Sequence, residues 1–360
     1  MKKDDENESP FMTTRRALMQ NALGIGAIGA LMAAGATPAM AASDEKEGNF
    51  PRHKKWKFTF VNHVTTNPFF VPTQYGIADA CALLGCDYQW TGSQRSIASE
   101  MVNAMDTAIA AQVDGIAVCL VDQHAFNQPV KRALEAGIPV FSYNADVKGN
   151  DRLAYIGQDL YLAGKALGER IVSLVDSGDV VGFISTPGQL NIQPRLDGAA
   201  DAIKESGKNI NFKQIATGPT VNEEVSQVDS YYVGHQNVKG MFAVDGGSTM
   251  AIAKTMQKFG LKQKGVVGGG FDMLPNTLDA IYRGDLDFTI DQQPYLQGFY
   301  TVMEMFMFKM SGGLSGPANI NTGLKFVTKD NVAPYLKTKT RFEGNSREEK
   351  VLERSGPIGS

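Results

Sequence analysis

The loop after the first strand-like run of the chain combines an amide with two aromatic rings. Residues 57–61 are rich in β-formers and lead into Asn67-Pro68-Phe69-Phe70. Phenyl faces pack on the C–H face of a polyol, and planar amides exchange hydrogen bonds with its hydroxyl groups. The loop therefore indicates one side of a site for a small, uncharged, hydroxyl-rich ligand.

Amides and carboxylates also follow most of the other strand-like runs, where open α/β sheets bind their ligands. The residues just past the predicted strand ends include His63, Asn67, Asp122, Gln123, Asn144, Asp146, Gln189, Asn191, Gln193, Asn222, Asp245, Asp272, Gln292 and Gln293. None of these positions holds Lys or Arg. Together with the paired Phe residues, they predict a cleft for a neutral polyhydroxylated molecule.

Each of these positions also has a purely structural interpretation. Asn222, Asp245 and Asp272 each precede a helical pattern, where Asn and Asp are good N-caps. Amides at the start of loops often satisfy turns. The case for binding therefore depends on the set as a whole.

Catalysis is the weaker interpretation. The four His residues have no metal-ligand spacing, and His63 has no recognisable nucleophile beside it, so we expect it to form hydrogen bonds. A glycosidase would need two placed carboxylates, and Asp245 with Asp272 remains that alternative. We predict no catalytic residue, no cofactor and no metal.

Strand and helix patterns alternate along the chain, which predicts an α/β fold with parallel sheets. We expect ten strands, at residues 57–61, 87–91, 115–121, 139–144, 154–158, 180–186, 211–217, 240–245, 265–272 and 286–292. Ten strands exceed one modest sheet, so we expect two doubly wound lobes joined by crossing hinge segments. Residues 294–310 carry an apolar stripe, which predicts a long core helix; its members are Leu296, Phe299, Met303, Phe306 and Met307.

The series pauses near residues 146–152, which sets the expected domain boundaries. We assign residues 57–158 and 294–321 to lobe 1, and residues 159–293 and 322–342 to lobe 2. Residues 42–56 are expected to be a linker, and residues 343–360 a flexible tail.

The amino end has the pattern of an export leader of the twin-arginine type. Arg15 and Arg16 precede an uncharged apolar run at residues 22–36, and Ala39-Met40-Ala41 predicts cleavage after Ala41. Residues 24–29 match a dinucleotide-binding spacing, but no strand precedes them. We expect a soluble periplasmic protein that uses the twin-arginine export machinery.

Composition agrees with an ordinary globular protein. The 360 residues are 43% hydrophobic and 20% charged, with a formal net charge of −3, which gives no reason to expect a nucleic-acid partner. Cys81, Cys86 and Cys119 fit no metal site. We expect three buried, reduced thiols, although Cys81 and Cys86 are close enough in sequence to pair.

Residues 57–331 resemble the periplasmic sugar-binding proteins of the ribose-binding type, the solute receptors of bacterial sugar ABC transporters. The shared motifs are Asn67-Pro68-Phe69-Phe70, Asp114-Gly115-Ile116, Ala136-Gly137-Ile138-Pro139-Val140, Arg195-Leu196-Asp197-Gly198, Gly270-Phe271-Asp272 and Thr289-Ile290-Asp291-Gln292-Gln293-Pro294. Several such motifs in the right order make the resemblance specific. It implies a type I periplasmic binding fold, capture of a sugar between two lobes, and delivery to a membrane permease.

The resemblance also implies residue roles. Asn67 would hydrogen-bond the ligand, while Phe69 and Phe70 would stack on it. The further contacts that it implies come from Asn144, Asp245, Phe271, Asp272 and Gln292. With the strand-end residues, the predicted binding set is His63, Asn67, Phe69, Phe70, Asp122, Asn144, Gln193, Asn222, Asp245, Phe271, Asp272 and Gln292.

Departures from the family pattern concern the substrate. Asn144 stands where the family usually has an acid, and Ala145 and Gln193 stand where ribose binders have arginines. Leu120 replaces an expected amide, and Arg195 is retained in a motif that we interpret as structural. The loss of guanidinium donors argues against ribose and against anionic sugars, and favours a sugar alcohol or a different pentose or hexose.

Two non-enzymatic alternatives share this fold. A periplasmic sensor would present bound sugar to a membrane receptor, and the sequence does not separate it from a transport receptor. An effector-binding repressor would need a helix-turn-helix at the amino end, where the export leader stands.

Overall fold

The computed structural model describes residues 52–314 and 316–337. The predicted leader, its cleavage site, the Gly-rich spacing at residues 24–29 and the expected tail lie outside the described residues. None of the described helices is long and apolar enough to cross a membrane.

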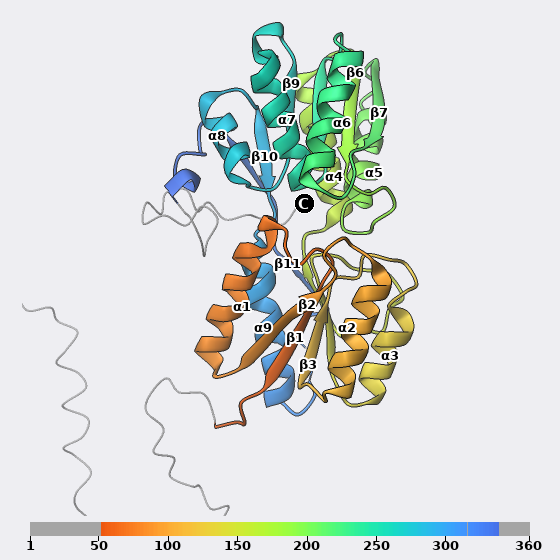
Figure 1. Ribbon diagram of the computed structural model, residues 1–360, viewed down its shortest axis with the longest axis vertical. Helices are drawn as coiled ribbons and strands as arrows, with labels where there is room; N and C mark the ends of the chain where they lie inside the picture. The colour runs from red at the N-terminus through yellow and green to blue at the C-terminus, as the bar shows by residue number, and fades with distance from the viewer. Residues whose placement is uncertain (1–51, 315, 338–360) are drawn as a thin grey trace, which may run out of the picture. The chain divides into compact units, whose positions relative to one another are not determined.

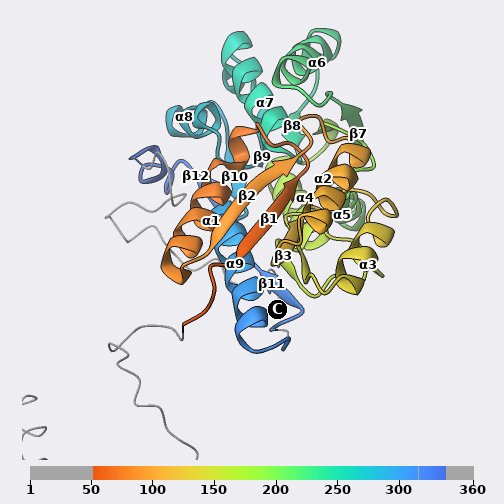
Figure 2. The same ribbon diagram turned by 60° about the horizontal axis from the view of Figure 1, so that its bottom comes forward.

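The first lobe is built on a six-stranded parallel sheet (Figure 1). Its order is β11-β5-β4-β3-β1-β2, formed by β1 (Lys57–Asn62), β2 (Asp87–Gly92), β3 (Gly115–Val118), β4 (Val140–Tyr143), β5 (Tyr155–Gly157) and β11 (Asn319–Asn321). Helices α1 (Val71–Leu84) and α9 (Pro294–Met310) lie together on one side of this sheet. Helices α2 (Ala98–Ala110) and α3 (Asn127–Glu135) lie together on the other (Figures 1 and 2).

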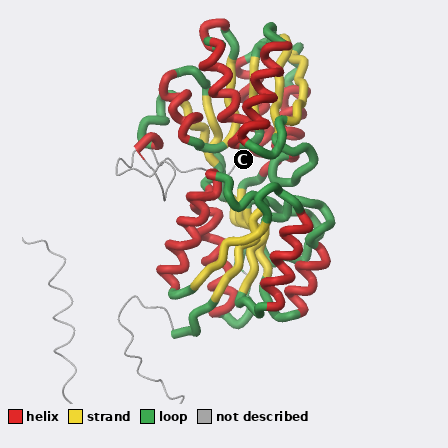
Figure 3. The backbone as a smooth tube through the Cα atoms, viewed as in Figure 1, coloured by secondary structure: helices red, strands yellow, loops and turns green. Residues whose placement is uncertain are grey.

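The second lobe repeats this plan with one difference. Its sheet has the order β12-β10-β9-β8-β6-β7, formed by β6 (Gly178–Ile184), β7 (Ile210–Ala216), β8 (Gly240–Ala243), β9 (Val267–Phe271), β10 (Phe288–Asp291) and β12 (Lys325–Thr328). Only β12 runs antiparallel to its neighbour. The helices are α4 (Leu160–Leu174), α5 (Gln193–Glu205), α6 (Val221–Gly234), α7 (Gly246–Phe259) and α8 (Pro275–Arg283), and Figure 3 shows helices flanking strands in both lobes.

The predicted α/β fold with two doubly wound lobes is confirmed. All ten predicted strands are present, and most are shorter than predicted; the third, for example, ends at Val118. The short strands β11 and β12 were not predicted. Each adds an edge strand to a sheet. The sequence Asn-Ile-Asn of β11 has no continuous apolar run, and β12 pairs antiparallel with β10.

Helix α9 has the predicted bounds, but its core face differs from the predicted stripe. Val302, Met305 and Phe306 are buried, whereas Met307 is 47% exposed. Helix α1 approaches α9 closely at Gly298. A Cβ on Gly298 would lie 2.2 Å from the carbonyl oxygen of Thr73. Backbone contact at this glycine decides which residues face the sheet.

Three segments cross between the lobes, at residues 158–159, 292–293 and 322–324. Hydrogen bonds join them: Gln158 Nε2 donates to the carbonyl of Gly323 at 3.1 Å, and Thr322 Oγ1 donates to the carbonyl of Gln292 at 2.8 Å. Gln158, Gln292 and Thr322 are all buried. The crossing segments therefore form one hydrogen-bonded layer rather than three independent linkers.

The three thiols are buried and unpaired, as expected. Burial raises the pKa of Cys81 and of Cys119 to about 12, and that of Cys86 to about 11. These cysteines pack as small apolar residues.

Candidate functional site

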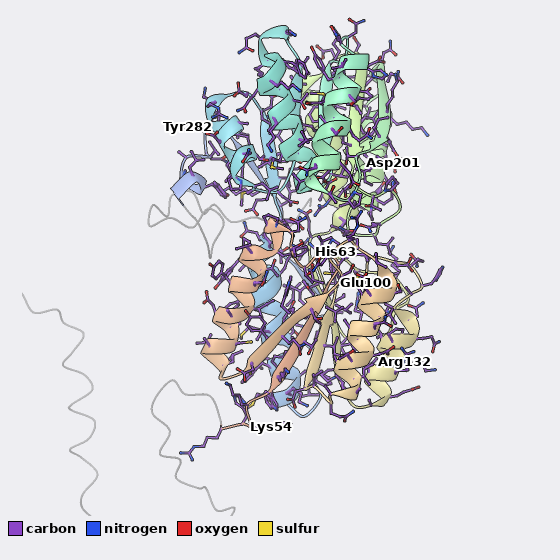
Figure 4. All side chains as sticks on the ribbon, viewed as in Figure 1. Lys54, His63, Glu100, Arg132, Asp201 and Tyr282 are labelled. Carbon is purple, nitrogen blue, oxygen red and sulfur yellow. The ribbon has the colours of Figure 1, made fainter. Side chains whose placement is uncertain are left out.

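The carboxyl ends of both sheets face one cleft, which encloses about 600 Å³ including its open mouth. The first lobe lines it with His63, Val64, Asn67, Phe69, Phe70, Ser96 and Asn144. The second lobe and the crossing segment line it with Ser185, Thr186, Gln189, Asn191, Ile192, Arg195, Pro219, Glu224, Asp245, Gly246, Gly247, Asp272 and Gln292. Figure 4 labels His63 where the two lobes meet. The many polar side chains of this lining suit a small polar ligand.

The aromatic loop of the first lobe is held by a local cap. Asn67 Oδ1 accepts a hydrogen bond from the main-chain N–H of Phe69 at 2.9 Å, at the start of the short helix η1 (Pro68–Phe70). Phe70 is buried and meets Phe69 edge to face, with ring centroids 4.7 Å apart. Phe69 is only partly buried, so it offers its ring to the cleft while Phe70 supports it.

His63 lies in the cleft as a neutral hydrogen-bonding group. Burial lowers the pKa of His63 to about 4, so the imidazole carries no charge near neutral pH. Its Nε2 lies 3.2 Å from Nδ2 of Asn191, which comes from the second lobe. Leu190 makes a second cross-lobe contact, since its N–H donates to the carbonyl of Val121 at 3.1 Å. These contacts hold the two lobes together on one side of the cleft.

Two strand-end residues reach the cleft from a left-handed backbone. Asn144 has φ 64° after β4, and Asp272 has φ 71° after β9. Asn and Asp tolerate this region better than other side chains with a Cβ, yet it remains a strained conformation. The same unusual geometry on both lobes brings an amide and a carboxylate to the site.

Asp272 is a buried carboxylate with named partners. Its Oδ1 accepts a hydrogen bond from Nε2 of Gln292 at 2.7 Å. Burial raises the pKa of Asp272 to about 6, although the charge of Arg195 and the bond from Gln292 oppose this shift. The group is therefore largely ionised at neutral pH and can accept hydrogen bonds from ligand hydroxyl groups.

Asp245 and Glu224 form a second acidic group. Asp245 caps α7: its carboxylate accepts from the N–H groups of Ser248 and Ser185, each at 2.9 Å. Burial first, and then the neighbouring Asp245, raise the pKa of Glu224 to about 9. Burial also raises the pKa of Asp245. Glu224 is thus protonated at neutral pH, where its carboxylic acid can donate a hydrogen bond.

Gly247 leaves the space that Glu224 occupies. A Cβ at this position would lie 1.9 Å from Oε2 of Glu224. The carboxyl group of Glu224 therefore packs directly on the first turn of α7.

Four residues of the predicted binding set do not line the cleft. Asp122 closes a turn, where its Oδ1 accepts from the N–H groups of His124 and Ala125 at 2.9 and 2.8 Å. Gln193 begins α5 and its amide bonds Asp197 and the N–H of Gly188. The carboxylate of Asp122 and the amide of Gln193 thus form hydrogen bonds with local backbone or side-chain groups.

The other two, Asn222 and Phe271, face away from the cleft. Asn222 is exposed on α6. Phe271 is completely buried in the core, with the guanidinium of Arg195 4.2 Å from its ring centroid. In a strand, alternate residues point to opposite faces, so Asp272 reaches the cleft and Phe271 does not.

Glu224 is not in the predicted binding set, although a local sequence motif marks the start of its helix. Thr220 and Glu223 form a capping box that starts α6 at Val221. From that start, Asn222 lies on the outer face and Glu224 on the inner one.

Arg195 lines the cleft and also holds the lobe together, in agreement with the structural role expected for its motif. Its Nη1 donates to the carbonyl of Val244 and its Nη2 to Oε1 of Gln158, both at 3.1 Å. Its buried Nε has no hydrogen-bond partner in the described part of the chain. Arg195 is the one Lys or Arg side chain among the described residues that line the cleft.

No group of three or more His, Cys, Asp or Glu side chains within residues 52–314 and 316–337 could hold a metal ion. The chemistry that the described side chains offer is hydrogen bonding and ring stacking.

Comparison with known proteins gives a consistent result. A family model described as a periplasmic binding protein domain matches residues 58–309. A xylose/arabinose-binding protein of Sulfolobus acidocaldarius is 48% identical over 314 residues, which cover 83% of this chain and 77% of the relative. A ribose import binding protein of Escherichia coli is 26% identical over 232 residues, covering 63% of this chain and 76% of that protein.

A solved structure agrees at the level of the fold. An ABC transporter solute-binding protein from Burkholderia graminis, in complex with D-arabinose, superposes with a TM-score of 0.74 at 28% identity. The match covers 80% of this chain and all of that one.

Proposed function

The chain belongs to the periplasmic binding protein family, as the sugar-binding subunit of an ABC importer, and we propose that its ligand is a neutral pentose of the xylose or arabinose type. Proteins of this family bind solutes and catalyse no reaction, so the glycosidase alternative with Asp245 and Asp272 is set aside. Asp245 has instead the role of a helix cap.

The proposal depends mainly on one observation: an apolar surface and a hydrogen-bonding surface face each other across the cleft. Phe69 on the first lobe offers a flat apolar ring, and Asp272 with Gln292 offers a hydrogen-bonded carboxylate–amide pair opposite it. A pyranose has one C–H face and a rim of hydroxyl groups, which matches this pairing. Asn67 and Asn144 add amides from the first lobe.

The charges of the cleft favour a neutral ligand. The carboxyl groups of Glu224, Asp245 and Asp272 line it, and the two Nη atoms of the nearby Arg195 already have protein partners. An anionic sugar would therefore meet carboxylates without a free guanidinium to pair with. Among neutral pentoses, the 48% identity to a xylose/arabinose-binding protein, against 26% to a ribose import binding protein, favours xylose or arabinose over ribose.

The lobes would deliver the sugar by closing on it. Ligand that contacts both lobes shifts an open–closed equilibrium toward the closed form, which would then dock on the membrane permease. We assign residues 57–158 and 294–321 to one moving lobe and residues 159–293 and 322–342 to the other. The three hydrogen-bonded crossing segments are the hinge between them.

We further propose that the protein reaches its extracytoplasmic site through twin-arginine export, with cleavage after Ala41. Replacing Arg15 and Arg16 with Lys should block export. Normal accumulation of the processed double variant outside the cytoplasm would refute this route.

Calorimetric titration and thermal unfolding of the mature protein test the ligand. The panel is D-xylose, L-arabinose, D-arabinose, D-ribose, D-glucose, xylitol and xylonate. At a concentration 100 times its dissociation constant, a true ligand adds about 2.7 kcal/mol to the free energy of unfolding. We expect xylose or an arabinose to bind most tightly, xylitol less tightly because it is not held as a ring, and xylonate not at all. Tighter binding of xylonate, or no stabilisation by any sugar, would overturn the proposal.

A further inference from the structure

Four buried polar side chains form a continuous hydrogen-bonded chain from the first lobe to the second. Asn144 Nδ2 donates to Oε1 of Gln297 at 3.2 Å, Gln297 Nε2 donates to Oε1 of Gln292 at 3.1 Å, and Gln292 Nε2 donates to Oδ1 of Asp272 at 2.7 Å. Asn144, Gln292 and Asp272 line the cleft. Gln297 lies behind them in the first turn of α9 and is completely buried.

The direction of this chain is set by two groups that only accept hydrogen bonds. The carboxylate of Asp272 requires Gln292 to present its NH₂ group, which leaves Oε1 of Gln292 toward Gln297. The main-chain carbonyl of Gln292 accepts from Nε2 of Gln297 at 3.2 Å. Both acceptors thus require the same orientation of the Gln297 amide, with its oxygen toward Asn144.

The orientation of Asn144 follows from that of Gln297. Because Oε1 of Gln297 can only accept, Asn144 must turn its NH₂ group away from the cleft. Its Oδ1 then faces the cleft, and no hydrogen bond within residues 52–314 and 316–337 engages that atom. The left-handed backbone of Asn144 (φ 64°) holds the side chain at this place.

We propose that Gln297 is a positioning residue that orients the Asn144 amide so that this amide can only accept a hydrogen bond from the sugar. The proposal deepens the pentose-binding function and rests on it. At this position related sugar-binding proteins are expected to have an acid, which is also an acceptor. A neutral amide with a fixed orientation accepts the same hydroxyl proton without placing a further negative charge near Asp272 and Asp245.

Deoxy- and fluoro-sugars test the direction of the hydrogen bond. A fluorine can accept weakly but cannot donate, so the sugar hydroxyl that donates to Asn144 is the one whose exchange for fluorine costs as much affinity as its removal. We expect one such position in the wild-type protein, with a loss of about 10-fold or more. This loss should vanish when Asn144 is replaced by Gly, which accepts the left-handed backbone of this position.

Replacing Gln297 with Met keeps the volume and removes all three hydrogen bonds of its side-chain amide. The Asn144 amide can then rotate, so we expect the discrimination between hydroxyl and fluorine at that position to fall to within about 2-fold. Retained discrimination in Gln297→Met with wild-type folding would overturn the proposal.

A double-mutant cycle separates this role from simple support of the fold. Gln297→Met should lower sugar affinity about 10-fold in the wild-type background and less than about 2-fold in Asn144→Gly. Equal losses in both backgrounds would mean that Gln297 acts through Gln292 or through stability, and would contradict the proposal. Gln193→Met, an amide outside the cleft lining, is the matched control and should change affinity less than 2-fold.

A measurement without ligand keeps this inference separate from the proposed function. In the free, isotopically labelled protein, the side-chain NH₂ protons of Asn144 should exchange slowly with solvent, and Gln297→Met should speed their exchange at least 10-fold. If no sugar binds but this difference is found, the pentose proposal fails and the orientation of Asn144 stands. Fast exchange in the wild type would refute the orientation whatever the ligand.

Discussion

The two walls of the cleft differ in chemistry although they come from sheets of the same design. The first lobe offers Phe69, the neutral His63 and two amides, Asn67 and Asn144. The second lobe offers three carboxyl groups and one arginine. The apolar face of a sugar belongs to the first wall and its hydroxyl rim to the second. Charge and its dependence on pH therefore reside mainly on one side of the ligand.

The walls also differ in how the chain builds them. Most first-lobe contacts come from one continuous stretch, residues 63–70, whereas the second-lobe contacts come from five separate loops or helix starts. The first wall is mainly a local structure, ordered by contacts such as the bond from Trp90 Nε1 to the carbonyl of Thr65 at 3.1 Å. The second wall exists only when strands β6, β8 and β9 are aligned.

The largest expected effect is at Asp272, on the charged wall. Asp272→Asn should weaken sugar binding about 30- to 100-fold, because a hydrogen bond to a charged group contributes about 2–3 kcal/mol. Asn is preferable to Ala because residue 272 has a left-handed backbone, which Asn tolerates. Calorimetric titration measures the loss, and unfolding by denaturant checks that the fold is retained. Binding within 3-fold of wild type would remove Asp272 from the site.

On the apolar wall, the expected effect is smaller. Phe69→Ala should weaken binding about 10-fold, since a stacked aromatic contact contributes about 1–1.5 kcal/mol. The loss should be the same at pH 6 and pH 8, because no titrating group is removed. Phe69→Tyr keeps the ring and is the control, which should bind like the wild type. A loss that varied with pH would break the distinction between the two walls.

Glu224 on the second wall and His63 on the first should change the free energy of unfolding with pH in opposite directions. Glu224 has its pKa raised from 4.5 to about 9 in the folded protein, so between these values the folded state binds more protons than the unfolded chain. The free energy of unfolding should therefore fall as pH rises through this window, by at most about 1.4 kcal/mol per pH unit for one proton. His63, with its pKa lowered from 6.5 to about 4, makes the protein less stable as pH falls through that window.

Denaturant unfolding of the ligand-free protein from pH 4 to pH 9 measures both contributions. Glu224→Gln should flatten the decline on the alkaline side, and His63→Gln should flatten the decline on the acid side. If Glu224→Gln leaves the alkaline slope unchanged, Glu224 is not protonated in the folded protein.

The smallest expected effect is on α6, where Asn222 and Glu224 lie two residues apart and face opposite sides of the helix. Asn222→Ala should change sugar affinity less than about 2-fold, because Asn222 is exposed and does not line the cleft. Glu224→Ala on the same helix should weaken binding measurably. A larger loss for Asn222→Ala than for Glu224→Ala would mean that the inner and outer faces of α6 are wrongly assigned.

Much of the fold could be predicted from the alternation of apolar strands and amphipathic helices. The ten strands and the bounds of α9 follow from local pattern, because buried parallel strands require continuous apolar runs. The edge strands β11 and β12 were not predicted: β11 has no continuous apolar run, and β12 pairs antiparallel, outside the alternation of parallel strands and helices. The exposed side of α9 was misjudged for a related reason: its contact with α1 at Gly298 is tertiary.

The residues of the site also divide into those that local sequence predicts and those that depend on tertiary structure. Asn67, Phe69 and Phe70 could be recognised from four consecutive residues, because the loop that they form is local. Strand-end position also identified Asp245, Asp272 and Gln292. It failed for Asp122 and Gln193, because local hydrogen bonds compete for the same side chains. The family resemblance implied a contact from Phe271, but this residue faces the core because adjacent strand residues face opposite sides.

Side-chain types and their order along the chain are sufficient to specify a two-lobed α/β protein with an aromatic loop and polar strand ends, since these are properties of local periodicity and turn chemistry. Which polar groups share the cleft, that Glu224 lies beside Asp245 and is protonated, and that Gln297 orients Asn144 depend on segments distant in sequence. Burial and hydrogen-bond direction are properties of three-dimensional neighbours. They arise only when the sheets, helices and crossing segments have packed together.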